Sequence, residues 1–107
     1  MARTTTRVIV IDGEEHKIAK LTIGTLRELA DQEKDLAPDD AFGTLTVNAT
    51  AVLRSMKRAD PACALDLPGL LDLLDEEDLR AAHSAVMALT TGREAAAVPP
   101  AGEPQSP

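Results

Sequence analysis

The chain has 107 residues, a net charge of -7, an apolar fraction of 44% and a single aromatic residue, Phe42. This length has room for one domain, whose core must be aliphatic. The negative charge disfavours nucleic acid, whose phosphates would repel the chain, and favours a partner with basic or apolar segments.

Cysteine content and hydropathy narrow the class of protein further. The one cysteine, Cys63, excludes an internal disulfide and a zinc site made of several cysteines. No apolar run is long enough for a membrane helix or for the core of a signal peptide. We therefore expect a soluble cytosolic protein.

The first predicted element is a β-hairpin. Residues 7–11 form the first predicted strand, in which residues 8–11 are apolar and β-branched, and residues 15–21 return as a second strand. Asp12 and Gly13 between them are typical of a type I′ turn, because Gly accepts the positive φ that this turn needs. A lone hairpin is marginal in water, so this one is expected to pack on helices.

The next predicted element is an amphipathic helix that begins within residues 23–26. Thr22 is the expected N-cap, and Thr25 followed by Glu28 matches a capping box. The predicted buried stripe of this helix comprises Ile23, Leu26, Leu29 and Ala30. Pro38 and the acidic residues after it end the element.

A second helix is predicted after a linker that contains Phe42 and Gly43. It is expected to end near Ala59, because Pro61 disfavours helical structure at Asp60. Its predicted buried face has helical spacing and consists of Leu45, Ala49, Val52, Leu53 and Met56.

Two further helices are predicted before the C-terminal region. Leu67 and Pro68 introduce a short helix over residues 69–74, and a final helix carries acidic residues in its first turn. Its stripe is Leu79, Ala82, Val86 and Leu89. Gly92 is the expected C-terminal cap.

These elements predict an α+β fold that is mainly α, with an N-terminal hairpin packed on three or four short helices. Residues 1–92 form the predicted domain. Residues 93–107 are rich in Pro and Ala and are predicted to be a flexible, disordered tail.

No set of residues matches a catalytic, cofactor-binding or metal-binding pattern. His16 and His83 lack neighbouring ligands, so both are interpreted as surface or half-buried histidines. Cys63 has no adjacent base and is interpreted as a small apolar filler. Asp72, Asp75 and Glu76 have the spacing of one helical face, but their charges are explained by the start of a helix.

The leucine-rich segment near residue 70 is the candidate for binding a partner. A chain of this size does not easily bury every leucine on itself, so an exposed remainder would form a partner surface. The predicted surface consists of Leu70, Leu71, Leu74, Leu79 and Val86.

The order of elements and three sequence phrases resemble the tail assembly chaperones of long-tailed bacteriophages. The phrases are LTIGTLREL at residues 21–29, RADP at 58–61 and LLDLLDEEDL at 70–79. The resemblance covers residues 8–92. The family is non-enzymatic and also commonly makes a longer form by ribosomal frameshifting.

The resemblance implies a specific partner and location. Members of this family bind the long, apolar tape measure protein in the host cytoplasm, keep it soluble and help to recruit tail tube subunits. They are then absent from the mature virion. A homo-oligomer, or several copies on one client, is compatible with this role.

Two other functions remain open from the sequence. A small structural tail or head-tail connector protein could use the hairpin to extend a neighbour's sheet. A bacterial adaptor could dock one amphipathic helix on a protein partner. The chain contains no residue set that predicts an enzyme.

Overall fold

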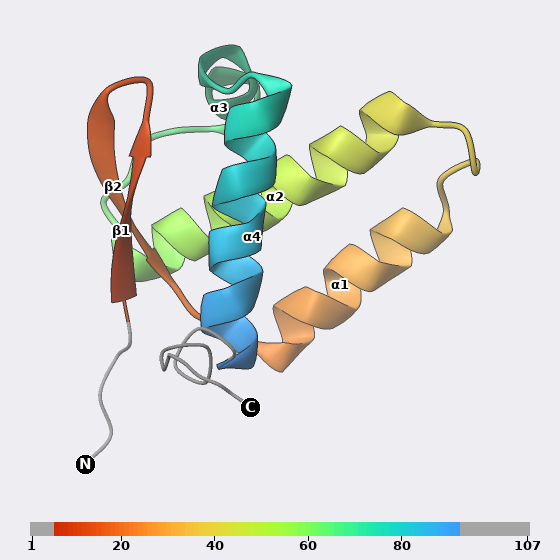
Figure 1. The fold of residues 1–107 in the computed structure, drawn as a ribbon. Helices are drawn as coiled ribbons and strands as arrows, with labels where there is room; N and C mark the ends of the chain where they lie inside the picture. Colours follow the sequence, from red (N-terminus) through yellow and green to blue (C-terminus); the bar gives the residue numbers. More distant parts are fainter. Residues whose placement is uncertain (1–5, 93–107) are drawn as a thin grey trace, which may run out of the picture.

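The computed structural model describes residues 6–92, which form a two-stranded hairpin followed by four helices (Figure 1). The strands are β1 (Thr6–Ile11) and β2 (Glu14–Ala19). In chain order, the helices are α1 (Ile23–Lys34), α2 (Ala41–Ala59), α3 (Leu67–Leu73) and α4 (Glu76–Thr91). The predicted α+β class, with a hairpin packed on helices, is confirmed. The predicted tail over residues 93–107 lies outside the described residues.

The hairpin has the turn that its sequence predicts. Ile11 lies opposite Glu14, and the two residues between them make the turn. Asp12 and Gly13 have φ angles of 52° and 81°, the left-handed values required at both central positions of a type I′ turn. The second strand ends at Ala19, two residues before its predicted end.

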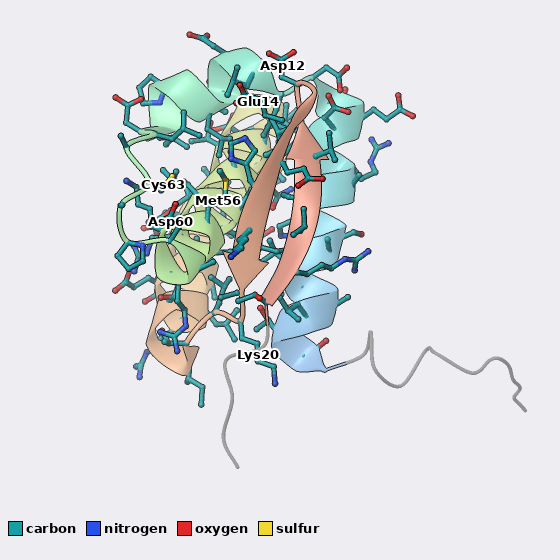
Figure 2. All side chains as sticks on the ribbon, turned by 90° about the vertical axis from the view of Figure 1, so that its left-hand side faces the viewer. Asp12, Glu14, Lys20, Met56, Asp60 and Cys63 are labelled. Atoms are coloured by element: carbon teal, nitrogen blue, oxygen red, sulfur yellow. The ribbon has the colours of Figure 1, made fainter. Side chains whose placement is uncertain are left out.

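The two faces of the hairpin differ in exposure. Ile11 and Ile18 are 1% and 0% exposed and point into the core, whereas Val8 and Val10 are 49% and 64% exposed. Strand β2 packs on α2, and β1 packs on α4. Figure 2 shows β1 on the side of the hairpin next to α4.

Helix α1 begins where predicted but buries a different side. Thr22 caps it, since its Oγ1 accepts a hydrogen bond from the Thr25 N–H at 3.1 Å. Thr25 and Leu29 are buried, one turn apart, whereas Ile23 is 84% exposed and Ala30 is exposed as well. The prediction that Ile23 and Ala30 belong to the buried stripe is therefore wrong.

A polar cluster between α1 and α2 explains this rotation of the helix. Arg54 of α2 donates hydrogen bonds to Thr25 Oγ1 at 3.3 Å and to Glu28 Oε1 at 3.0 Å. Because Arg54 and Thr22 both donate a hydrogen bond to the Thr25 hydroxyl, this polar side chain can face inward. Glu28 pairs with another helix, so the predicted capping box of Thr25 and Glu28 is wrong.

Helix α2 begins earlier than predicted, at Ala41. Asp40 is its N-cap, with Oδ1 accepting the Gly43 N–H at 2.8 Å. Phe42 and Gly43 therefore lie in the first turn, and the prediction that they form a linker is wrong. The aspartate cap offsets the low helix propensity of glycine. The helix ends at Ala59, as predicted.

Helix α2 is the centre of the core. Its buried residues are Val47, Ala49, Ala51, Val52, Leu53, Ser55 and Met56, whereas the predicted Leu45 is only half-buried. The buried Ser55 hydroxyl donates to the Ala19 carbonyl at 2.6 Å and accepts from the Ala19 N–H at 3.0 Å. This pair of hydrogen bonds fixes the end of β2 on α2.

The acidic, leucine-rich segment folds as two helices separated by a cap. Helix α3 ends at Leu73, and Asp75 caps α4 by accepting the Asp78 N–H at 2.7 Å. Asp72 therefore lies on a different helix from Glu76. The prediction of one helical face for these acids is wrong, because the chain is extended at the residues that join α3 to α4.

Helix α4 agrees with its prediction. The stripe is buried in full and consists of Leu79, Ala82, Val86 and Leu89. Gly92 caps the helix with a φ of 77°, a left-handed conformation that glycine adopts without strain. Within residues 6–92, no helix is both long and apolar enough to cross a membrane.

Candidate functional site

The five apolar residues predicted as a partner surface do not lie on one surface. Leu70, Leu79 and Val86 are 0%, 4% and 0% exposed and belong to the core. Leu71 and Leu74 are half-buried and pack against the same core. Leu70, Leu79 and Val86 therefore cannot form a surface of the folded protein, and the partly exposed Leu71 and Leu74 are too few to form a partner surface by themselves.

An apolar groove lies between α1 and α4, with α2 as its floor. Figure 1 shows that α1 begins beside the end of α4 and that the two helices then diverge, with α4 crossing α2 and α1 running alongside it. The Leu21 N–H, just before α1, donates to Thr90 Oγ1 of α4 at 3.1 Å. This bond holds the narrow end together, and the groove beyond it has a volume of about 250 Å³.

Side chains from three helices line this groove, and most of them are apolar. They are Leu26, Leu29, Ala30, Glu33, Val47, Asn48, Ala51, His83 and Met87. Leu26, Leu29 and Ala30 were predicted to lie on the stripe of the first helix, but a groove was not predicted. The sequence feature that best indicated this groove was Met87. It follows His83 by one helical turn and therefore lies on the same face of α4.

Two titratable residues, His83 and Glu33, line the groove. His83 is half-buried, and burial lowers its pKa below the ordinary value of 6.5, while the charge of Glu33 raises it back in part. The imidazole is therefore mostly neutral at pH 7. A groove with a neutral imidazole and an apolar floor suits an uncharged, apolar segment of a partner.

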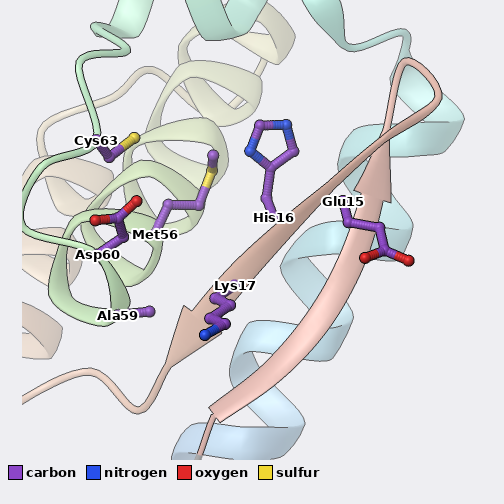
Figure 3. A pocket seen from close by; sticks show the side chains of 7 residues that line it. All are labelled: Glu15, His16, Lys17, Met56, Ala59, Asp60 and Cys63. Carbon is purple, nitrogen blue, oxygen red and sulfur yellow. The ribbon is translucent and has the colours of Figure 1, made fainter.

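A second pocket, of about 410 Å³, lies between β2 and the C-terminal part of α2 (Figure 3). His16 Nε2 is buried and makes no hydrogen bond with the described residues, and the Glu14 carboxylate is 3.9 Å away. Cys63 is half-buried and packs against the core, as predicted for a filler. The lining also includes the charged residues Glu15 and Lys17, so this pocket suits an apolar partner less well than the groove does.

The two histidines, predicted to be at the surface or half-buried, are both half-buried. Within residues 6–92, no group of three or more His, Cys, Asp or Glu side chains is placed to hold a metal ion. No protein-family profile, curated protein or solved structure matches the chain. Functional inference therefore depends on the geometry of the groove.

Proposed function

We propose that this protein is a non-enzymatic chaperone that binds a phage tape measure protein and keeps it soluble in the host cytoplasm during tail assembly. The observation that carries the proposal is the apolar groove between α1 and α4. The identity of the client comes from the resemblance to tail assembly chaperones. The tail tube protein is a second proposed partner, recruited to the complex of chaperone and client.

The shape of the groove supports a helical client. Two helices form its walls and a third forms its floor, which is the arrangement that receives the apolar face of an amphipathic helix. Leu26, Val47 and Met87 offer apolar contacts from all three helices. A tape measure protein, with its long apolar helical segments, has many such faces to shield.

The chemistry of the lining supports binding that tolerates many sequences. The groove contains no aromatic residue and has a flexible Met87 side chain, which adapts to different shapes. The net charge of -7 keeps a complex of chaperone and client soluble through repulsion between complexes. Both features suit transient protection of a long client better than one tight contact.

The test is co-expression with a phage tape measure protein. We expect the client to become soluble and to copurify with several copies of this chain. A client that stays insoluble in the presence of the folded chain would contradict the proposal.

A matched pair of variants tests the groove. Ala30→Glu places a charge at the exposed edge of the groove, so we expect loss of client solubility with the fold intact. Gln32→Glu adds the same side chain and charge on the exposed side of the same helix, and it should leave solubility unchanged. Equal behaviour of the two variants would argue against this groove as the client site.

One observation favours a second candidate function, that of a structural tail or connector protein. The outer edge of β1 has no strand beside it within residues 6–92, and such an edge could extend the sheet of a neighbouring subunit. Finding the chain in purified particles would favour this function over the chaperone, which should be absent from the mature virion.

A further inference from the structure

Helix α1 carries an apolar stripe that residues 6–92 leave uncovered. Ile23, Leu26 and Ala30 lie three and four residues apart, so they share one side of the helix. Ile23 is 84% exposed, the highest value of any large apolar side chain in that range. Leu26 is half-buried, Ala30 is exposed, and both line the groove between α1 and α4. The apolar surface of the groove therefore continues along α1 to Ile23.

The described residues end beside this surface. Gly92 caps α4, and Thr90, two residues earlier, accepts a hydrogen bond from the Leu21 N–H just before α1. Figure 1 shows the end of α4 next to the start of α1, and Ile23 is the first residue of α1. Residues 93–107 therefore continue the chain from the narrow end of the groove.

This continuation contains one apolar segment, residues 95–98, with the sequence Ala-Ala-Ala-Val. Arg93 and Glu94 precede it, and Pro99 and Pro100 end it. Its side chains carry no charge, and three of the four are small. Such a segment suits an aliphatic groove that is narrow at the end from which the chain arrives.

The apolar segment is within reach of the groove. An extended chain advances about 3.3 Å per residue, so Val98 can lie up to about 20 Å from Gly92. The part of α4 from His83 to Gly92 is about 13 Å long, because a helix rises about 1.5 Å per residue. Val98 can therefore reach the level of His83, and the alanines before it can reach Met87.

We propose that residues 95–98 bind in the groove between α1 and α4 of the same chain, so that the chain covers Ile23 on its way from Gly92. Because the segment is tethered beside the groove, its effective concentration there is in the millimolar range. A contact too weak to hold a free peptide is then sufficient. Burial of one valine and three alanines against aliphatic side chains is a contact of this strength, and it places no charge in the groove.

The contact has a consequence for the client. The groove is the proposed client site, so this consequence, unlike the binding of residues 95–98 itself, rests on the proposed function. A groove that the segment occupies half of the time raises the apparent dissociation constant of the client about twofold. A client helix with a long apolar face displaces the segment, whereas a short apolar peptide competes poorly. The groove thereby selects long apolar faces.

The experiment records methyl NMR spectra of the full chain without any client. The double variant Ala97→Asp, Val98→Asp puts two charges into the apolar segment, so we expect the segment to leave the groove. The methyl signals of Ile23, Leu26 and Met87 should then shift. The variant changes no residue of the core, so the fold should persist, as circular dichroism can check.

The matched control adds the same charge farther along the chain. Gln105→Asp, Ser106→Asp makes an equal change in net charge beyond Pro99 and Pro100. This control should leave the three methyl signals in place. If it shifts them as the first variant does, or if neither variant shifts them, the proposal is overturned.

The same contact can be observed from the segment itself. The Val98 methyl signals of the wild type should differ from their positions in the chain unfolded by urea. Ala30→Glu should move them toward the unfolded positions, whereas Gln32→Glu, on the exposed side of the same helix, should not. Wild-type Val98 signals that already match those of the unfolded chain would contradict the proposal.

Dilution distinguishes the chain's own segment from that of a second copy. An intramolecular contact does not depend on concentration, so the differences between the wild type and the variants should persist at every concentration. Differences that vanish on dilution would show a contact between copies and would overturn the proposal. Because these spectra contain no client, binding of the segment together with an insoluble client would reject the proposed function alone.

Discussion

Helices α1 and α4 both pack on α2, but they are attached to it by different means. Helix α4 buries four apolar residues, while α1 buries Thr25 and Leu29 alone. Much of the attachment of α1 is polar and passes through Arg54. The groove therefore has one wall, α4, that is fixed in the core and one wall, α1, that is held by a few contacts. Elements with little apolar burial open at low free energy, so α1 is the adjustable wall.

The largest expected effect comes from truncating a buried side chain of α2, the helix on which α4 packs. Met56 is 1% exposed at the centre of the core, and Met56→Ala should lower the free energy of unfolding by about 2–5 kcal/mol because it leaves a cavity. Urea denaturation measures the loss. Met87→Ala, at the half-buried groove, is the control and should cost less. Equal losses of unfolding free energy in the two variants would mean that Met87 contributes as much to stability as the core residue Met56.

The second prediction concerns the bond between the hairpin and α2. Ser55→Ala removes the partner of both backbone groups of the buried Ala19, so we expect a loss of about 1–3 kcal/mol. Ser84 is exposed on α4, and Ser84→Ala should change little in the same denaturation experiment. A Ser55→Ala protein as stable as the wild type would mean that the two backbone groups find other partners.

The third prediction sharpens the contrast between the two helices. Arg54→Ala should cost about 0.2–1 kcal/mol, because the Arg54–Glu28 pair is half exposed. We expect amide exchange to accelerate in α1 and to stay nearly unchanged in α4. Exchange that accelerates equally in both helices would show that α1 and α4 open together.

The smallest expected effect is a pH dependence at the groove. Burial lowers the pKa of His83 in the folded protein below 6.5, so the unfolded chain takes up the proton first as the pH falls. The contribution of His83 should therefore reduce stability as the pH falls through 6.5, and the reduction should level off below the folded pKa. The difference in unfolding free energy between the wild type and His83→Gln, measured at several pH values, isolates this contribution.

The opposing charge of Glu33 gives this prediction a control. Glu33→Gln removes the charge that raises the pKa of His83, so the pKa should fall further. An NMR titration of the imidazole measures it directly. An unchanged titration would mean that α1 stands farther from α4 in solution, and it would weaken the account of the groove.

The sequence predicted the elements whose signals are local. The Asp12-Gly13 turn, the Thr22 cap, the stripe of α4 and the Gly92 cap were all correct. Each depends on the conformational preference of one or two residues, or on a regular apolar spacing. Such signals do not require knowledge of the neighbouring elements.

The wrong predictions concern features that depend on neighbours. Ile23 is apolar and Thr25 is polar, yet Thr25 is the buried residue, because Arg54 from another helix bonds its hydroxyl. The apolar groove could not be predicted either, because Leu26, Val47 and Met87 come from three helices. Of the residues chosen as a partner surface, Leu70, Leu79 and Val86 are buried in the core, which has to be filled by aliphatic side chains because the single aromatic residue, Phe42, is exposed.

The positions of the two ends of the domain have a consequence for engineering. Thr6 lies opposite Ala19, and Leu21, two residues later, is bonded to Thr90 near the end of α4. The first strand and the last helix therefore meet at one end of the molecule (Figure 1). A short linker could join them, and new ends could be opened in the exposed loop after Pro38. Such a circular permutant would keep most of the core, from α2 to β2, ahead of α1 and carry α1 as its final helix, which could then be shortened or replaced to reshape the groove.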